Sequence, residues 1–187
     1  TNEDNYLFQK FIRTAFGNNN VDYCTRLCHA STVTAMLRAL GSGAGSNSID
    51  DYETADCILV TGNNMVETHP VTATYVKRGV AAGGKLIVID PRWTPLVKHA
   101  DVWLQPKLGT DIALLNGLMN VIVRENWIDR DFITHRVERG LEAFEELKAV
   151  VADYPPETVE AITGVAQGKL LTAARLFARA DKALIAS

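Results

Sequence analysis

The sequence has few cysteines, no excess of basic residues and no long apolar run. Its 187 residues include 3 cysteines and carry a formal charge of -3, and the 19 lysine and arginine residues are scattered along the chain. Three cysteines cannot all pair and are too few for a disulfide scaffold, so a reducing compartment, the cytoplasm, is the simpler expectation. Without a basic cluster to neutralise phosphates, nucleic acid is not an expected partner.

Signals for membrane insertion and export are also missing. No apolar run reaches the roughly 18 residues that a membrane span needs, and the opening TNEDNYLFQKF lacks the basic and apolar regions of a signal peptide. The hydrophobic content of 47% is that of a globular protein, without low-complexity tracts or repeats. One large domain or two small ones are therefore expected.

The first part of the chain reads as helical. Residues 1–17 predict an amphipathic helix that stops at Gly17. Its apolar residues recur at helical spacing: Leu7, Phe8, Phe11, Ile12, Ala15 and Phe16. Ser31 is the expected N-cap of a second helix that ends at Gly41. Residues 41–53 are rich in Gly and Ser and predict a loop.

Strands and helices alternate from Asp56 onward. The predicted strands are residues 57–62, 85–90 and 101–105, and residues 181–187 begin like another strand. Helices are expected at 71–82 and 111–126, and most of the last third is helical. Because the strands are continuously apolar, both sheet faces should be covered. We therefore expect an α/β, Rossmann-like, doubly wound and mainly parallel sheet in residues 55–187, with a helical and loop segment at 1–54 before it.

Ligands of such sheets bind beyond the carboxyl ends of the strands. Three loops qualify: residues 62–70, 90–94 and 106–111. Their backbone N–H groups and amides suit a phosphate, and Glu67, Asp90 and Asp111 could accept from a ribose hydroxyl or a guanine edge. The alternative is that these residues only form turns and that Asp90 only caps a helix. Neither G-x-G-x-x-G nor a Walker motif is present, which disfavours a simple NAD site or an ATPase.

The stretch DYCTRLCHAST places Cys24 four residues before Cys28, which His29 follows. Four interpretations are open: a zinc site, a disulfide, two buried structural cysteines, or a single thiolate ligand with a neighbouring acid–base histidine. Zinc is disfavoured because the remaining candidate ligands have no characteristic spacing. Those candidates are Cys57, His69, His99 and His135. A disulfide would close only a small loop and stabilise little.

Four segments together resemble the catalytic subunit of molybdenum or tungsten formate dehydrogenases, in the molybdopterin oxidoreductase superfamily that includes dimethyl sulfoxide reductase and periplasmic nitrate reductase. The segments are TNEDNYLFQKFIRTAFGNNNVDYCTRLCHASTV, SGAGSNSIDDYETADCILVTGNNMVETHPV, IVIDPRWTPLVKHADVWLQPKLGTDIALLNGL and YPPETVEAITGV. The resemblance is collinear over nearly the whole chain.

The resemblance implies a role for each candidate residue. Cys28 falls on the protein ligand to the metal, and His29 falls on the histidine that assists proton removal from formate. Cys24 matches no essential role, and residues 43–47 match a loop near the active site. The cofactor implied is bis-molybdopterin guanine dinucleotide with Mo or W. The implied contacts to its guanine nucleotide are Gly62, Asn63, Asn64, Glu67, Thr68, His69, Asp90, Pro91, Arg92, Thr94, Gly109, Thr110 and Asp111.

The same comparison implies that this chain is an internal fragment of a larger multidomain fold. The family's N-terminal domain, which holds a 4Fe-4S cluster, and its second half are not in these residues. We therefore expect formate oxidation to CO2 in a full-length protein working with electron-transfer subunits, and no activity from this chain alone. A nitrate or other oxyanion reductase, or a non-catalytic module that binds a nucleotide or a partner, remain the alternatives.

Two further expectations follow from the resemblance. The apolar helix stripe from Leu7 to Phe16 and the terminal strand would normally be covered, so self-association of the chain is expected. A periplasmic location stays open beside the cytoplasm, because an export signal would lie upstream of these residues.

Overall fold

The chain divides into two compact units, Thr1–Ser46 and Asn47–Ser187. The structure is a computed structural model that describes residues 2–187, so Thr1, part of the first predicted helix, lies outside the described residues. The sequence places the boundary after residue 54. In the structure α4 (Asp51–Thr54) instead packs against α6 (Pro70–Ala81), which places it in the larger unit. The predicted loop at 41–53 therefore ends in this short helix.

The smaller unit contains α1 (Asn2–Ala15), α2 (Thr25–Cys28) and α3 (Ala30–Leu40), and none of the residues in these helices is buried. The predicted first helix is present. The third helix ends at Gly41, which is left-handed as expected of a C-terminal cap. The prediction of Ser31 as the N-cap is wrong, because the break between α2 and α3 falls at His29 (φ -144°) and Ser31 lies inside the helix.

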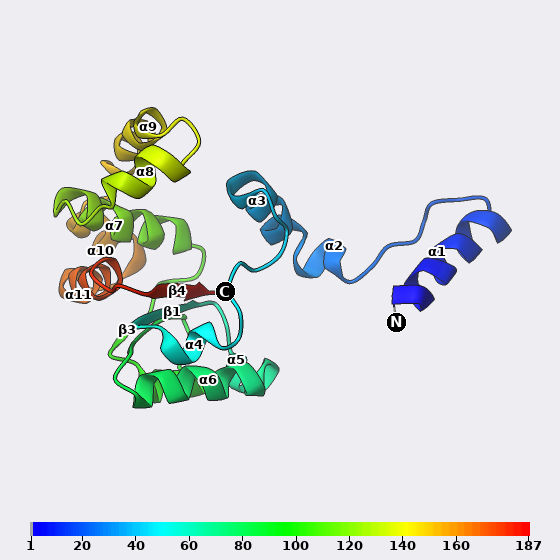
Figure 1. Cartoon of the computed structure of the whole chain (residues 1–187), viewed down its shortest axis with the longest axis horizontal. Coiled ribbons are helices and arrows are strands. Elements are labelled where there is room, and N and C mark those ends of the chain that lie inside the picture. Colours follow the sequence, from blue (N-terminus) through cyan, green and yellow to red (C-terminus); the bar gives the residue numbers. More distant parts are fainter. Residues whose placement is uncertain (1) are drawn as a thin grey trace. The chain divides into compact units, whose positions relative to one another are not determined.

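The larger unit is built on a parallel sheet of four strands in the order β3-β2-β1-β4. Figure 1 shows β4 beside β1. The strands are β1 (Cys57–Thr61), β2 (Lys85–Ile89), β3 (Val102–Leu104) and β4 (Ala183–Ala186). Central strand β1 pairs in parallel with β2 on one side and β4 on the other, with Cys57 opposite both Lys85 and Ala183. The short run that closes the sequence is thus a full member of the sheet.

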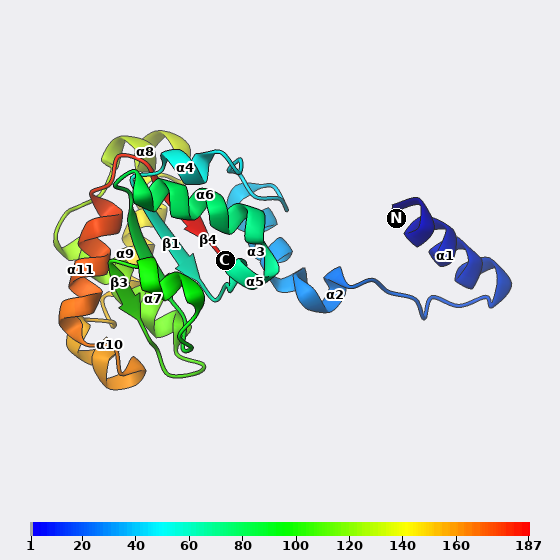
Figure 2. The ribbon, with the colours of Figure 1, turned by 90° about the horizontal axis from the view of Figure 1, so that it is seen from below.

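Helices cover both faces of this sheet, as the continuous apolar strands predict. One face packs against α7 (Asp111–Arg124), α10 (Pro156–Thr163) and α11 (Gln167–Ala178). The other face packs against α6, α5 (Met65–Thr68) and the 3-10 helix η1 (Pro95–His99), and Figure 2 shows α6 lying across it. Next to α7 lie α8 (Arg130–Arg136) and α9 (Leu141–Val151) (Figure 1). The predicted doubly wound α/β fold is confirmed.

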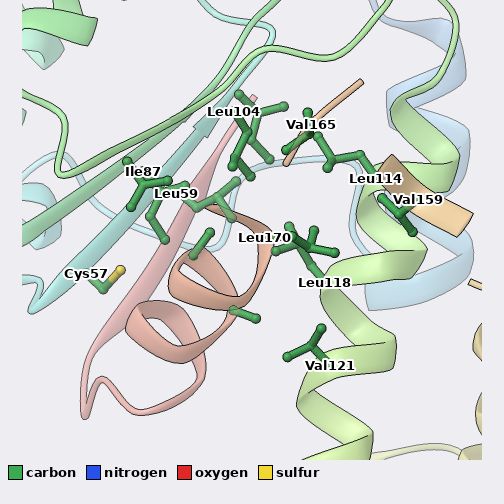
Figure 3. Packing of buried hydrophobic residues seen from close by; sticks show 14 residues of the cluster. Cys57, Leu59, Ile87, Leu104, Leu114, Leu118, Val121, Val159, Val165 and Leu170 are labelled. Carbon is green, nitrogen blue, oxygen red and sulfur yellow. The ribbon is translucent and has the colours of Figure 1, made fainter. Parts of the chain in front are cut away.

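Alternate residues of β1 fill the two cores. Leu59 enters the cluster on the α11 side, whereas Ile58 and Val60 enter the cluster on the α6 side. Figure 3 shows Leu59 and Leu104 near Leu170 of α11. The Leu170 side chain is fully buried. Among residues 2–187, no helix combines the length and the apolar character needed to cross a membrane.

Gly79 of α6 provides a test of the packing between α4 and α6. A Cβ at Gly79 would lie 2.5 Å from the backbone oxygen of Tyr52 in α4, which cannot move as a side chain can. Gly79→Ala should therefore lower the free energy of unfolding by about 1–3 kcal/mol, measured by urea denaturation.

Gly168 of α11 is the matched control, because a Cβ there meets nothing within 4 Å. Gly168→Ala should leave stability unchanged or raise it by up to about 1 kcal/mol. Equal stability of the two variants would contradict the packing described here.

Candidate functional site

The carboxyl ends of the strands meet at one edge of the sheet, and the predicted ligand loops follow them. Hydrogen bonds tie each loop to the end of the neighbouring strand: Gly62 N donates to Ile89 O of β2 at 2.9 Å, and Asp90 N donates to Leu104 O of β3 at 3.2 Å. The Gln105 side-chain amide donates to Pro91 O at 2.9 Å. The structure therefore brings the loops after β1, β2 and β3 together within the larger unit, as the parallel topology predicts.

The loop after β1 turns at Gly62, whose φ of 60° favours glycine. Asn64 occupies the N-cap position of α5, yet its side chain makes no capping hydrogen bond. Its Oδ1 atom is buried without a hydrogen-bond partner. A buried acceptor left unpaired is costly, and a donor on a bound ligand would satisfy it.

The other predicted residues of this loop surround Asn64. The Thr68 hydroxyl donates to Asn64 O at 3.1 Å and lies 2.9 Å from the Nδ1 atom of His69, while Glu67 is exposed. Asn63 and His69 line a cavity of about 180 Å3 at the carboxyl ends of β1 and β4. Cofactor pockets commonly span about 300–1,000 Å3, so this cavity can enclose only part of such a ligand.

Asp90 directly follows β2 and is 4% exposed. Its carboxylate accepts the backbone N–H of Arg92 at 2.7 Å, and its carbonyl oxygen accepts the Trp103 indole N–H at 2.9 Å. Asp90 thus stabilises the turn that follows β2, which agrees with the alternative interpretation that these residues form turns. It does not cap a helix, as that interpretation also suggested. The Arg92 side chain is 73% exposed and its Nε lies 3.9 Å from Asp90 Oδ1, which leaves the guanidinium available to a phosphate.

Thr94 supplies the second unpaired atom of this edge. Its residue is 3% exposed, and its hydroxyl oxygen has no hydrogen-bond partner. The hydroxyl of Thr94 and the amide oxygen of Asn64 are thus unsatisfied polar atoms in the loops after the neighbouring strands β2 and β1. Trp93, beside Thr94, is exposed and lies under the Lys98 ammonium at 5.5 Å from the ring centroid.

The loop after β3 leads into α7. Gly109 has a φ of 77°, and the Thr110 hydroxyl donates to Lys107 O at 2.6 Å. Asp111 is exposed in the first turn of α7, where its negative charge interacts favourably with the positive end of the helix dipole. Lys107 N donates to Thr163 O at 2.9 Å, which ties this loop to the end of α10.

Residues that the sequence did not single out complete the cavity. Tyr52, Met65 and Thr72 line it together with the end of β4. Burial raises the pKa of the Tyr52 phenol. No local pattern marks Tyr52, because it lies in a Gly- and Ser-rich stretch and only the packing of α4 brings it to this place.

Cys28 and His29 lie in the smaller unit, at the end of α2. Cys24 and Cys28 are both exposed free thiols, whereas Cys57 is buried. Of the four interpretations of this pair, that of two buried structural cysteines is therefore excluded. The neighbouring Cys24 thiol, chiefly through its charge when ionised, raises the pKa of Cys28. Within residues 2–187, no three His, Cys, Asp or Glu side chains cluster closely enough to hold a metal ion.

Comparison with known proteins gives this geometry a context. The sequence pattern of the family described as Molybdopterin oxidoreductase matches residues 1–186. The F420-dependent formate dehydrogenase 1 subunit alpha of Methanococcus maripaludis is 48% identical over 99% of this chain, and formate dehydrogenase H of Escherichia coli is 41% identical over 98% of it. The chain spans 27% and 25% of these two relatives.

A solved structure agrees with the fold. Acetylene hydratase from Pelobacter acetylenicus superimposes with a TM-score of 0.77 and 32% sequence identity, over 98% of this chain and 24% of that protein.

The three thiols provide a test of the local structure. Burial, followed by the nearby charges of Asp101 and Asp56, raises the pKa of Cys57 to about 11. Near pH 8 iodoacetamide should therefore modify Cys24 and Cys28 in the native chain and reach Cys57 only in denaturant, because thiolates are the reactive form. Mass spectrometry counts the modified residues, and Cys57→Ala should remove only the modification that appears in denaturant. Rapid native modification of Cys57 would contradict the buried position.

Proposed function

The chain belongs to the molybdopterin oxidoreductase family, and on that premise we propose that it forms part of the catalytic subunit of a formate dehydrogenase. Membership of this family implies a molybdenum or tungsten pterin cofactor. The observation that carries the proposal is the Cys28-His29 pair in a chain 48% identical to a formate dehydrogenase alpha subunit. Formate oxidation to CO2 is the proposed activity of a protein of the relatives' length.

The metal ligand proposed in this chain is the thiolate of Cys28. Sulfur is a suitable donor for a soft metal centre, and the exposed thiol of Cys28 is free of any disulfide. When bound, the cofactor accepts the electron pair removed from formate. His29 follows at the N-cap of α3 with an exposed imidazole, which we propose as the general base that accepts the proton of formate.

We assign the guanine nucleotide of a molybdopterin guanine dinucleotide to the carboxyl edge of the sheet. Two unpaired buried atoms, Asn64 Oδ1 and Thr94 Oγ1, support this assignment, because guanine and ribose carry donors and acceptors that could satisfy them. The exposed guanidinium of Arg92 is suited to a phosphate. The remaining contacts proposed are Gly62, Asn63, Glu67, Thr68, His69, Asp90, Pro91, Gly109, Thr110 and Asp111.

The partners proposed are electron-transfer subunits, with a 4Fe-4S cluster in a preceding part of a longer polypeptide. We propose that the 187-residue chain by itself does not oxidise formate. We also propose that it self-associates. Exposed apolar side chains support self-association: Phe8 of α1 is 60% exposed, and Ile185 of the edge strand β4 is 57% exposed. The free thiols agree with the cytoplasm as the proposed compartment.

A chimera tests the proposed function. This chain replaces the matching segment of the E. coli relative, and formate-dependent dye reduction and the molybdenum or tungsten content are measured. The chimera should oxidise formate. Cys28→Ala should abolish both activity and bound metal, whereas His29→Ala should keep the metal and lose about 10²–10⁴-fold in turnover.

Cys24→Ala is the matched control, since that residue is a neighbouring thiol without a proposed role in catalysis. It should retain activity and metal. A Cys28→Ala chimera that keeps its metal and oxidises formate would contradict the proposal. An unsubstituted chimera that reduces nitrate and does not oxidise formate would favour an oxyanion reductase instead.

A further inference from the structure

The cavity beside β1 and β4 lies where the order of the strands reverses. The chain places β2 and then β3 on one side of β1, and it places β4 on the other side. In open α/β sheets, ligands bind beyond the carboxyl ends of the strands at such a switch point. Asn63 follows β1 and Ala186 ends β4, and both line this cavity of about 180 Å3. The topology thus marks this cavity, among the loops of the edge, as the place for a ligand.

The side chains around the cavity are polar, yet they include no acid, lysine or arginine. Within residues 2–187, the cavity is lined by Tyr52, Asn63, Met65, His69, Thr72, Ala186 and Ser187. A phosphate is commonly bound by arginine or lysine, and neither residue type is in this set. Phenol, amide, imidazole and hydroxyl groups instead match the hydroxyls of a sugar, each of which can donate and accept a hydrogen bond.

His69 offers this cavity a hydrogen-bond acceptor. The Thr68 hydroxyl donates its single proton to Asn64 O at 3.1 Å, so its oxygen accepts in the 2.9 Å contact with His69 Nδ1. A neutral His69 therefore carries its proton on Nδ1, a tautomer assigned from the hydrogen-bond network. The Nε2 atom keeps its lone pair, to which a sugar hydroxyl can donate.

Tyr52 offers a hydrogen-bond donor from α4. This helix packs so closely on α6 that a Cβ at Gly79 would lie 2.5 Å from the backbone oxygen of Tyr52, and the contact fixes the backbone that carries the phenol. The side chain is half-buried, and burial raises the pKa of the Tyr52 phenol. The phenol is therefore a neutral donor near pH 7.

The carboxylates in the loops after β1 and β2 do not take the place of these groups. Asp90 is 4% exposed and accepts the backbone N–H of Arg92 at 2.7 Å, Glu67 is exposed, and neither acid lines the cavity. A sugar in the cavity would thus meet the neutral side chains of Tyr52 and His69.

We propose that this cavity is a ribose subsite, in which the Tyr52 hydroxyl donates to one sugar hydroxyl and His69 Nε2 accepts from another. The inference rests on the proposed guanine nucleotide site and specifies which part of the ligand the cavity takes. The base and the phosphate are left to the neighbouring loops. The site therefore selects ribonucleotides over analogues without sugar hydroxyls, and Tyr52 is a residue that sets this preference.

Titration calorimetry on the 187-residue chain compares guanosine monophosphate with its 2′,3′-dideoxy analogue, which lacks both sugar hydroxyls. The analogue should bind roughly 10–100-fold more weakly, because two hydrogen bonds are lost and their protein partners are left unpaired. Equal binding of the two compounds would overturn the ribose subsite and leave the nucleotide site standing.

Tyr52→Phe removes the phenol oxygen and keeps the ring that packs against the core on the α6 side. The substitution should weaken the binding of guanosine monophosphate about tenfold and leave the binding of the analogue unchanged. The ratio of the two affinities should therefore fall. An unchanged ratio would overturn the inference, because a residue that only packs affects both compounds equally.

Tyr154→Phe is the matched control. Tyr154 is also half-buried, but it packs against the core on the α11 side. Its substitution removes the same oxygen and should leave both affinities as they are.

The failure of the inference can be told apart from the failure of the proposed function. A folded chain that does not bind guanosine monophosphate would overturn the ribose subsite together with the nucleotide assignment. The metal ligand is tested separately by the Cys28→Ala chimera, whose metal content is measured without any nucleotide titration.

Discussion

The parallel pairing of β1 with both of its neighbours is the constraint on which the rest of the larger unit depends. Because Cys57 lies opposite Lys85 and Ala183, the strands run in step and end at the same edge. Apolar side chains alternate between two covered faces, so burial of both cores fixes this register. The loops after β1, β2 and β3 are therefore neighbours, although they are far apart in the sequence. The proposed nucleotide site is a consequence of the register.

The strands and the long helices could be predicted from the sequence, and the shortest helices could not. Continuous apolar runs marked the strands, and helical stripes marked α1, α6, α7 and the C-terminal helices. The helices α2, α4 and α5 have four residues each, too few for a periodic pattern to appear. For the same reason the start of α3 was misplaced at Ser31: the break at His29 depends on a turn of helix that the sequence pattern does not reveal.

The two parts of the candidate site differ in what the sequence could show. Gly62 and Asn64 follow a strand, so their position at the sheet edge was predictable, whereas the unpaired state of Asn64 Oδ1 emerges only from the packed structure. Tyr52 reaches the cavity through the packing of α4 on α6. The assignment of Cys28 as a metal ligand came from the family resemblance, because spacing alone left four interpretations of the cysteine pair open. The structure adds that both thiols are exposed.

Titration calorimetry with guanosine monophosphate on the 187-residue chain tests most directly whether this sheet edge is a nucleotide site. The account predicts saturable binding that adenosine monophosphate does not reproduce. Asn64→Ala should weaken the binding by roughly tenfold, the value of about one hydrogen bond, whereas Asn20→Ala, an exposed residue of the smaller unit, should leave it unchanged. A folded chain that releases no heat with guanosine monophosphate, or that binds both nucleotides equally, would contradict the account.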